Sequence, residues 1–200
     1  MYVKEIWRYP VKSMAGERLD RAEVTLLGIS GDRQVLVVNS QGRVVTARSH
    51  PALLGHKATL ADNGVPQVDG RPWTDPLVLA DIRKIAGPGA ELIHNETADR
   101  FDVLPLLVAT DGAIAEFGRD GRRLRPNLVI GGVKGLDERQ WPGRKLRIGE
   151  VMIHLPYQGR WARLLRTFVE TLANIYSPQP AASMKTSARG RRVGRNPGVS

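Results

Sequence analysis

Basic and polar side chains occur at four places where the chain is expected to turn. Lysine, arginine and asparagine donate hydrogen bonds to phosphate or carboxylate oxygens, and the free N–H groups at a helix start favour the same ligands. If these groups converge in space, they suit a phosphorylated, highly polar heterocycle. The four places are Lys12-Ser13, the loop 28–33 that ends on Arg33, Thr110-Asp111, and Arg125-Pro126-Asn127.

Each of these places also fits a purely structural role. Lys12 and Ser13 could be two solvated loop residues, and an arginine that enters a strand, such as Arg33, is usually a surface residue. A threonine before a helix is most often a cap. The residue types alone therefore leave a binding site and a set of structural residues both open.

The composition is that of a soluble globular chain. Its 200 residues suit one compact domain or two small ones, with 42% apolar and 25% charged residues. The sequence contains no apolar run of the roughly 18 residues that span a membrane, and its first residues lack a signal-peptide pattern. We expect a cytoplasmic protein. Because the sequence has no cysteine, disulfides, thiolate nucleophiles and cysteine-ligated metals are excluded.

The net charge of +10 is distributed unevenly. Residues 1–157 hold 22 basic and 19 acidic side chains, a balance of +3, whereas residues 158–200 hold eight basic side chains and only Glu170 as an acid. The basicity therefore belongs mainly to the C-terminal segment. It indicates little about the rest of the chain.

Alternation of apolar and polar residues predicts a mainly β fold with a few short helices, of the antiparallel barrel or sandwich type. A short helix is expected to begin at Thr110 or Asp111 and to end at Gly118. Apolar residues recur at helical spacing over 162–176 and predict an amphipathic helix at 158–176, followed by a basic disordered tail at 177–200. Strands are expected at 2–7, 22–27, 34–38, 43–47, 128–131 and 146–153, the last with a turn or bulge at Gly149-Glu150, and 103–108 is expected to be a short buried apolar run.

Three motifs in order resemble a known family. They are "YPVKSMAGE", "LLGISGDRQVLVVNSQGRVVTARSHPAL" and "RRLRPNLVIGG" with "WPGRKLRIGEVMI". The chain is similar to the MOSC superfamily, named for the C-terminal part of molybdenum-cofactor sulfurase, and within it to the amidoxime-reducing branch. The likeness extends over about residues 1–155. It implies an N-terminal β-barrel region at 1–86 and a MOSC core at 87–157 that is truncated or diverged at its end.

The resemblance implies a β-barrel that binds the molybdenum cofactor, molybdopterin, and an oxidoreductase of N-oxygenated substrates. An electron-transfer or cofactor-accepting protein is the expected partner. Binding of pyridoxal phosphate is implied only by the relation of the family to the sulfurases, and no lysine that would form a Schiff base with it can be identified. Positions that match the family's cofactor-binding residues are Lys12, Ser13, Arg33, Thr110, Asp111, Arg125 and Asn127, and Arg48 in "TARSHP" is expected to line the pocket.

The sequence departs from the family where a metal-binding cysteine is expected. Trp161 follows Arg160 at that place, and indole cannot replace a thiolate as a metal ligand. His154 could substitute, although its apolar strand favours a structural role. A shifted reading frame and a genuine divergence toward a non-catalytic cofactor binder both explain the C-terminal segment.

Three functional classes follow for the chain. They are a molybdenum-dependent oxidoreductase, a module that carries the cofactor or sulfur to another protein, and a nucleic-acid contact through the basic tail. The last is disfavoured because no aromatic residue is interleaved among the arginines of the tail.

Overall fold

The computed structural model describes residues 1–102, 104–118, 120–155, 171–176, 182–185 and 194–195. The chain divides into two compact units, each built from segments that are separated in the sequence. Unit 1 contains 1–7, 18–30 and the chain from Val103, and unit 2 contains 8–17 and 31–102. Each unit is described by itself below.

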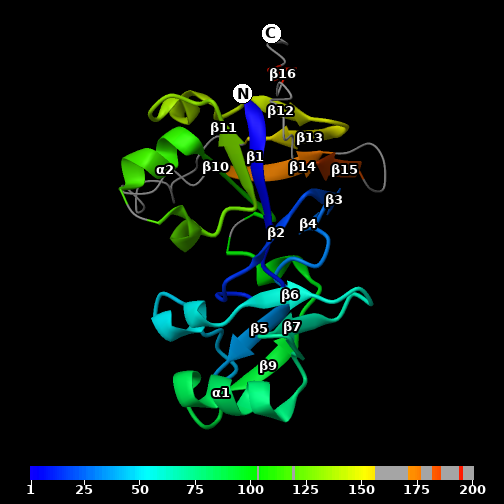
Figure 1. The fold of residues 1–200 in the computed structure, drawn as a ribbon, viewed down its shortest axis with the longest axis vertical. Helices are drawn as coiled ribbons and strands as arrows, with labels where there is room; N and C mark the ends of the chain where they lie inside the picture. Colours follow the sequence, from blue (N-terminus) through cyan, green and yellow to red (C-terminus); the bar gives the residue numbers. More distant parts are fainter. Residues whose placement is uncertain (103, 119, 156–170, 177–181, 186–193, 196–200) are drawn as a thin grey trace. The chain divides into compact units, whose positions relative to one another are not determined.

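Unit 1 is organised around an eight-stranded sheet with the order β16-β12-β13-β14-β10-β11-β1-β2 (Figure 1). Strands β10 and β11 are parallel, and helix α2 (Asp111–Phe117) lies between them in the sequence, as a parallel connection requires. The strands are β1 (Tyr2–Arg8), β2 (Glu17–Leu19), β10 (Leu106–Thr110), β11 (Leu128–Gly131), β12 (Lys145–Ile148), β13 (Val151–His154), β14 (Thr171–Tyr176) and β16 (Gly194–Arg195).

A smaller sheet with the order β15-β3-β4 also belongs to unit 1. Its strands are β15 (Ala182–Lys185), β3 (Arg21–Thr25) and β4 (Gly28–Ile29), and two 3₁₀ turns, η3 (Gly121–Leu124) and η4 (Asp137–Gln140), complete the unit. Residues from both sheets contribute to one hydrophobic core, which includes Ile6, Val24, Leu128, Trp141 and Ile153. This continuous core joins β1 and β3 to the strands that follow Val103.

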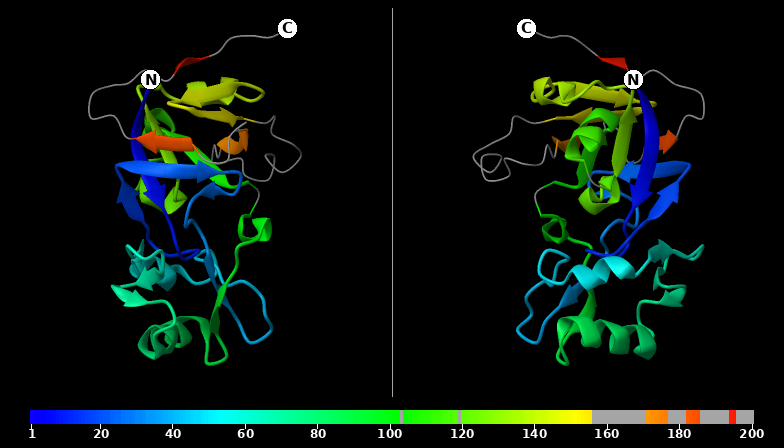
Figure 2. Two further views of the ribbon diagram at one scale, coloured as in Figure 1. Left: turned by 90° about the vertical axis from the view of Figure 1, so that its right-hand side faces the viewer. Right: turned by 60° about the vertical axis from the view of Figure 1, so that its left-hand side comes forward.

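Strands β12 and β13 form a hairpin, the yellow pair in Figure 2. Ile148 pairs with Val151, so only Gly149 and Glu150 form the turn. Gly149 has φ 61°, and a glycine with positive φ at the first turn position matches the twist of antiparallel strands. The turn predicted at Gly149-Glu150 is confirmed.

Unit 2 contains two small sheets, helix α1 and two 3₁₀ turns. Strand β5 (Val35–Val38) pairs with β9 (Glu91–His94), and β6 (Ala58–Leu60), β7 (Pro66–Val68) and β8 (Arg71–Pro72) form the other sheet. Helix α1 spans Pro76–Ala86, η1 spans Pro51–Gly55 and η2 spans Ala98–Arg100. The core of the unit consists of Val11, Met14, Val35, Val37, Val45, Leu53, Ala58, Val68, Val78, Ile82 and Ala90.

The mainly β architecture agrees with the sequence prediction, with two local differences in unit 2. Residues 43–47 form no strand and make only an isolated bridge between Val38 and Val44. Helix α1 was not expected, although its signals are present. The Asp75 side chain caps its first turn by accepting from the Leu77 N–H at 2.8 Å, and Pro76 and Gly87 bound the helix.

The C-terminal segment differs from its prediction where the structure describes it. Residues Thr171–Tyr176, expected as the end of an amphipathic helix, form strand β14. They pair with both β10 and β13, so hydrogen bonds to two neighbouring strands replace those within a helix. Strands β15 and β16 lie in the segment expected to be a disordered tail. Trp161 and the rest of the expected helix, 158–170, lie outside the described residues.

The two units also differ from the contiguous segments 1–86 and 87–157 expected from the sequence. Strand β1 pairs with β11, so the first residues join the unit that contains the C-terminal half. Strand β9 pairs with β5, which extends unit 2 to Asp102. Long-range pairing of this kind leaves no local signal in the sequence.

Candidate functional site

Lys12 is held at both its backbone and its side chain. Its N–H donates to the Val35 carbonyl at 2.8 Å, which ties the segment after β1 to β5. Its side chain is 11% exposed, and the ammonium group donates to the Arg100 carbonyl at 2.9 Å and contacts Asp102 Oδ1 at 2.7 Å. An ammonium group has three N–H donors. Two of them are therefore used within the protein and one is left for a ligand.

Asp102 lies between two of the predicted site residues. Its Oδ1 contacts Lys12 and its Oδ2 contacts Arg48 Nη2 at 3.2 Å. Burial raises the pKa of Asp102, but the hydrogen bond from Lys12 and the positive charges of Lys12, Arg48 and Arg33 outweigh burial and lower this pKa below its usual range. The carboxylate thus stays ionised between two cations.

Arg33 is fixed by Asp32 and Tyr9. The completely buried Asp32 accepts from the Tyr9 N–H at 2.7 Å and forms an ion pair with the guanidinium of Arg33. The Arg33 N–H donates to the Tyr9 carbonyl at 2.7 Å, and its guanidinium carbon lies 5.4 Å from the centre of the Tyr9 ring. These contacts hold the guanidinium in one place, which suits recognition of an anion.

Arg100 is a residue of this site that the sequence prediction missed. It is 5% exposed, and its guanidinium carbon lies 4.7 Å from the centre of the Phe101 ring. Burial is the largest influence on the pKa of Arg100 and lowers it; the charge of Arg33 lowers it further, while Asp32 and Glu96 raise it. Together with Lys12, Arg33 and Arg48, Arg100 forms what we call the basic cluster of unit 2. Nothing in "TADRFD" distinguishes this arginine from a surface residue.

Ser13 places a buried hydroxyl beside Lys12 in the sequence. The residue is 2% exposed, and its Oγ has no hydrogen-bond partner in the described part of the protein. A buried hydroxyl without a partner is costly to the folded state. A bound ligand that accepts from Ser13 would remove this cost.

Strained backbone coincides with three of the predicted site residues. Among the described residues, the non-glycine residues with positive φ are Ser13 at 71°, Arg33 at 53°, Asp69 at 51° and Arg125 at 50°. The left-handed region is unfavourable for residues other than glycine, asparagine and aspartate. Strain of this kind is often found at functional sites, where the surroundings impose it.

Thr110 and Asp111 have structural partners at the start of α2. The Thr110 hydroxyl oxygen accepts from the Ala113 N–H at 2.9 Å and donates its proton to Glu138 at 3.1 Å. Asp111 accepts from the backbone N–H groups of Gly132 at 2.7 Å, Val133 at 3.0 Å and Gly112 at 2.9 Å. Burial raises the pKa of Asp111, but these backbone hydrogen bonds and the charge of Lys4 lower it below the usual range. The side chains cap a helix that begins and ends as the sequence predicts.

Asn127 also uses its amide within the protein. Its Oδ1 accepts from the Leu107 N–H at 3.1 Å and its Nδ2 donates to the Trp7 carbonyl at 3.3 Å, so the amide connects the ends of β1 and β10. The side chain is completely buried. Arg125, two residues earlier, is partly buried and precedes the buried Pro126. Asn127 therefore has a structural role in unit 1, and its assignment to a cofactor stays a prediction.

The predicted site residues fall into two sets of four. Unit 2 brings together Lys12, Ser13, Arg33 and Arg48, which belong to or adjoin the basic cluster. The residues that unit 1 contributes are Thr110, Asp111, Arg125 and Asn127. In unit 1, Thr110 lies at the end of β10, whereas Asn127 precedes β11 and contacts Leu107 near the start of β10, so the structure does not bring these two pairs together.

No group of three or more His, Asp or Glu side chains arranged to hold a metal ion occurs among the described residues. His154 lies in β13 opposite Lys145. Burial raises the pKa of Asp69, but the hydrogen bond from the Lys57 N–H and the His56 ring, whose Nδ1 lies 2.7 Å away, lower this pKa overall. Within the same part of the chain, no helix has both the length and the apolar character needed to cross a membrane.

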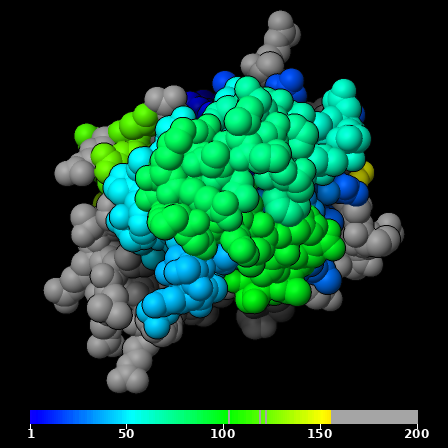
Figure 3. Space-filling view, turned by 90° about the horizontal axis from the view of Figure 1, so that it is seen from below, coloured from blue at the N-terminus to red at the C-terminus, as the bar shows by residue number. Residues whose placement is uncertain are grey.

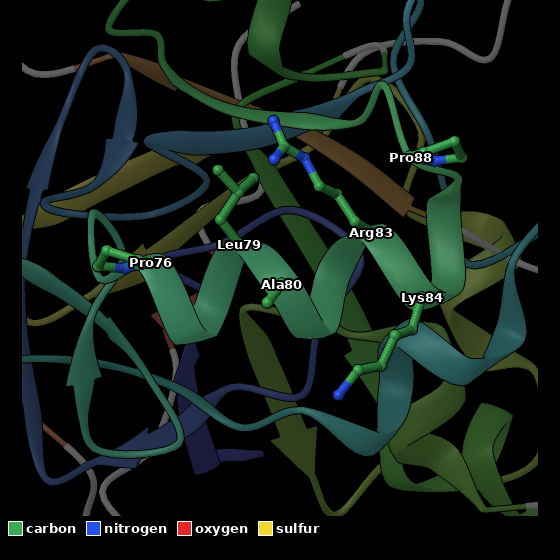
Figure 4. A pocket seen from close by; sticks show the side chains of 6 residues that line it. All are labelled: Pro76, Leu79, Ala80, Arg83, Lys84 and Pro88. Atoms are coloured by element: carbon green, nitrogen blue, oxygen red, sulfur yellow. The ribbon is translucent and has the colours of Figure 1, made fainter.

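A shallow apolar pocket of about 570 Å³ lies along α1 in unit 2. Its lining residues are Pro76, Leu79, Ala80, Arg83, Lys84 and Pro88, and the two basic side chains extend in different directions from the helix (Figure 4). The cyan and green residues of unit 2 form a continuous surface when seen from below (Figure 3). None of the predicted site residues lines this pocket.

The comparison with known proteins finds a family match in the N-terminal part of the chain. Residues 1–78 match the family of the MOSC N-terminal beta barrel domain. This part of the chain therefore carries the domain that its motifs predict.

Relatives of the chain are mitochondrial amidoxime-reducing components. Component 1 from Homo sapiens is 46% identical over an alignment of 207 positions that covers 74% of this chain and 61% of the relative. Component 2 from Macaca fascicularis is 36% identical over 97 residues, covering 46% of this chain and 27% of the relative. Component 2 from Bos taurus is 41% identical over 81 residues, covering 38% of this chain and 24% of the relative. The chain thus covers less than two thirds of the length of each of these relatives.

Proposed function

We propose that the chain binds the phosphorylated pterin of the molybdenum cofactor and takes part in the reduction of N-oxygenated compounds. The observation that carries this proposal is the basic cluster, in which Lys12 is followed in the sequence by Ser13 with its unpartnered hydroxyl. Lys12 and Arg33 are held by neighbouring groups, and the Ser13 hydroxyl is buried with its hydrogen-bonding capacity unused. Two cations and a hydroxyl are the donors that a phosphate group accepts from.

The comparisons support the same assignment of activity. The relatives are named for the reduction of amidoximes, which are N-oxygenated compounds. In a cofactor-dependent reduction the cofactor supplies the redox chemistry, and the protein supplies binding, orientation and charge. Lys12, Ser13 and Arg33 would hold the phosphate end, with Arg48 at the exposed edge. An electron-transfer protein is the corresponding partner.

A second function, carriage of the cofactor to another protein, is favoured by one observation. The sequence has no cysteine, and a thiolate is the soft ligand that a molybdenum ion would take from the protein. The residues of the basic cluster suit the phosphate, whereas the chain offers no thiolate for the metal. A carrier needs only the first of these two interactions.

Ser13→Ala tests the proposed binding site because the hydroxyl makes no contact that stabilises the fold. We expect the purified full-length variant from cofactor-producing cells to be at least as stable as the wild type and to bind the pterin about 10 to 100 times more weakly. Pterin fluorescence and metal analysis of the same preparation measure cofactor content. Ser49→Ala is the matched control, since its hydroxyl donates to the Thr46 carbonyl in an exposed loop.

The outcomes separate the two candidate functions. Bound pterin, bound molybdenum and reduction of an amidoxime with a chemical electron donor support the reductase. Pterin that transfers to a second protein, without amidoxime reduction, supports the carrier. Wild-type protein without pterin, or a Ser13→Ala variant that retains as much pterin as Ser49→Ala, would refute the proposed site.

A further inference from the structure

Asp102 occupies the position between Lys12 and Arg48 where an anionic ligand would sit. Its two carboxylate oxygens contact the two cations separately, at 2.7 Å to Lys12 Nζ and 3.2 Å to Arg48 Nη2. A carboxylate that accepts from two cations in this way imitates two oxygens of a phosphate group. The predicted anion site therefore already holds an anion that belongs to the protein.

The two ends of this arrangement differ in their exposure to solvent. The side chain of Lys12 is 11% exposed, whereas those of Asp102 and Arg48 are 50% and 73% exposed. The exposed pair between Asp102 and Arg48 contributes little to stability, and an incoming anion would replace Asp102 at the less exposed Lys12. Lys12 stays in place in this exchange, since it also donates to the Arg100 carbonyl at 2.9 Å.

We infer that Asp102 is an internal competitor that makes the basic cluster select dianionic phosphate groups over singly charged anions. This inference rests on the proposed function, in which the basic cluster binds the phosphate of the cofactor. A singly charged anion that displaces Asp102 from Lys12 and Arg48 only replaces one carboxylate by an equivalent charge. A phosphate monoester carries nearly two charges and a third acceptor oxygen, so its exchange with Asp102 is favourable.

A third oxygen also has donors available in the cluster. One N–H of Lys12 is left after its two contacts within the protein, and the Ser13 hydroxyl has no partner. The guanidinium group of Arg33 adds positive charge near Asp102. The cluster therefore offers more to a phosphate than Asp102 uses.

Asp102→Asn tests the inference by removing the competing charge while preserving the size of the side chain. We expect the full-length variant to bind inorganic phosphate about tenfold more tightly than wild type at low ionic strength. Acetate, as a singly charged probe, is expected to bind measurably only to the variant. The dissociation constants are measured by NMR titration of the amide resonances of residues 12–13, 33 and 48.

Two further variants serve as controls for the charge change. Asp102→Glu keeps the negative charge and is expected to bind phosphate as the wild type does. Asp81→Asn removes a carboxylate from an exposed ion pair with Lys84 on α1, and so changes the net charge equally at a distance from the cluster. Its phosphate affinity should also equal that of the wild type.

The result distinguishes this inference from the proposed function. If Ser13→Ala weakens phosphate binding but Asp102→Asn binds no more tightly than Asp81→Asn, the competitor role of Asp102 is wrong and the phosphate site stands. If neither the wild type nor Asp102→Asn binds phosphate at the cluster, both the inference and the proposed site are refuted.

Discussion

Replacement of Asn127 by alanine tests whether this residue stabilises the fold in the absence of any ligand. The buried amide accepts from the Leu107 N–H and donates to the Trp7 carbonyl, so Asn127→Ala removes the partner of two backbone groups. Each polar group left without a partner costs about 1–3 kcal/mol. We expect the free energy of unfolding to fall by about 2–4 kcal/mol, which lowers the urea midpoint by about 1–2 M for a typical urea dependence.

Urea unfolding followed by circular dichroism measures this change in ligand-free protein. Hydrogen exchange of the Leu107 amide gives a local readout, because that N–H loses its acceptor in the variant. Asn63→Ala is the matched control, since its side chain accepts only from the Val65 N–H in an exposed turn, and it should cost less than about 1 kcal/mol. Equal midpoints for the two variants would show that the Asn127 amide contributes nothing to the fold and would refute the reasoning.

Two further predictions concern α2. In Gly112→Ala a Cβ atom would lie 2.2 Å from the Gly135 carbonyl oxygen and 2.6 Å from that of Val133. Thermal unfolding should therefore show that the free energy of unfolding falls by at least about 2 kcal/mol. Gly55→Ala, with open space at that position, should melt as the wild type does. Burial raises the pKa of Asp111, but the N–H groups of Gly132, Val133 and Gly112 lower it overall. The ionised Asp111 therefore stabilises the fold fully above about pH 4, and this stabilisation is lost as the pH falls through the lower folded-state pKa. Asp111→Asn should flatten the acid side of a plot of unfolding midpoint against pH; a wild-type slope between about pH 2 and pH 5 would contradict this assignment.

The sequence predicted best the elements whose signals are local. Thr110 and Gly118 bound α2, strand β11 has the expected residues Leu128–Gly131, and Gly149 marks the β12–β13 turn. Each depends on a cap, an apolar run or a turn residue within a few positions. Helix α1 had equally local signals in Asp75, Pro76 and Gly87. The regular spacing of strand-like runs in this part of the sequence nevertheless favoured a prediction of strands over a helix.

Features that depend on distant pairing could not be predicted in this way. Lys12 contacts a carbonyl 88 positions away at Arg100, and no spacing in the sequence connects the two. The segment 171–176 satisfies a helical period, yet it forms a strand because β10 and β13 offer hydrogen-bond partners on both sides. The motifs that resemble the family supplied Lys12, Ser13 and Arg33, whereas Asp32, Arg100 and Asp102 became visible only in the folded chain.

The pairing of β1 with β11 has a consequence for synthesis of the protein. Tyr2 pairs with Gly131 and Ile6 with Leu128, so strand β1 leaves the ribosome long before its partner β11 has been translated. The segments of unit 2 end at Asp102 and are complete before that partner appears. Because domains tend to fold as units as they emerge, we expect unit 2 to fold first, while β1 relies on chaperones or on its own short length to avoid pairing with the wrong edge.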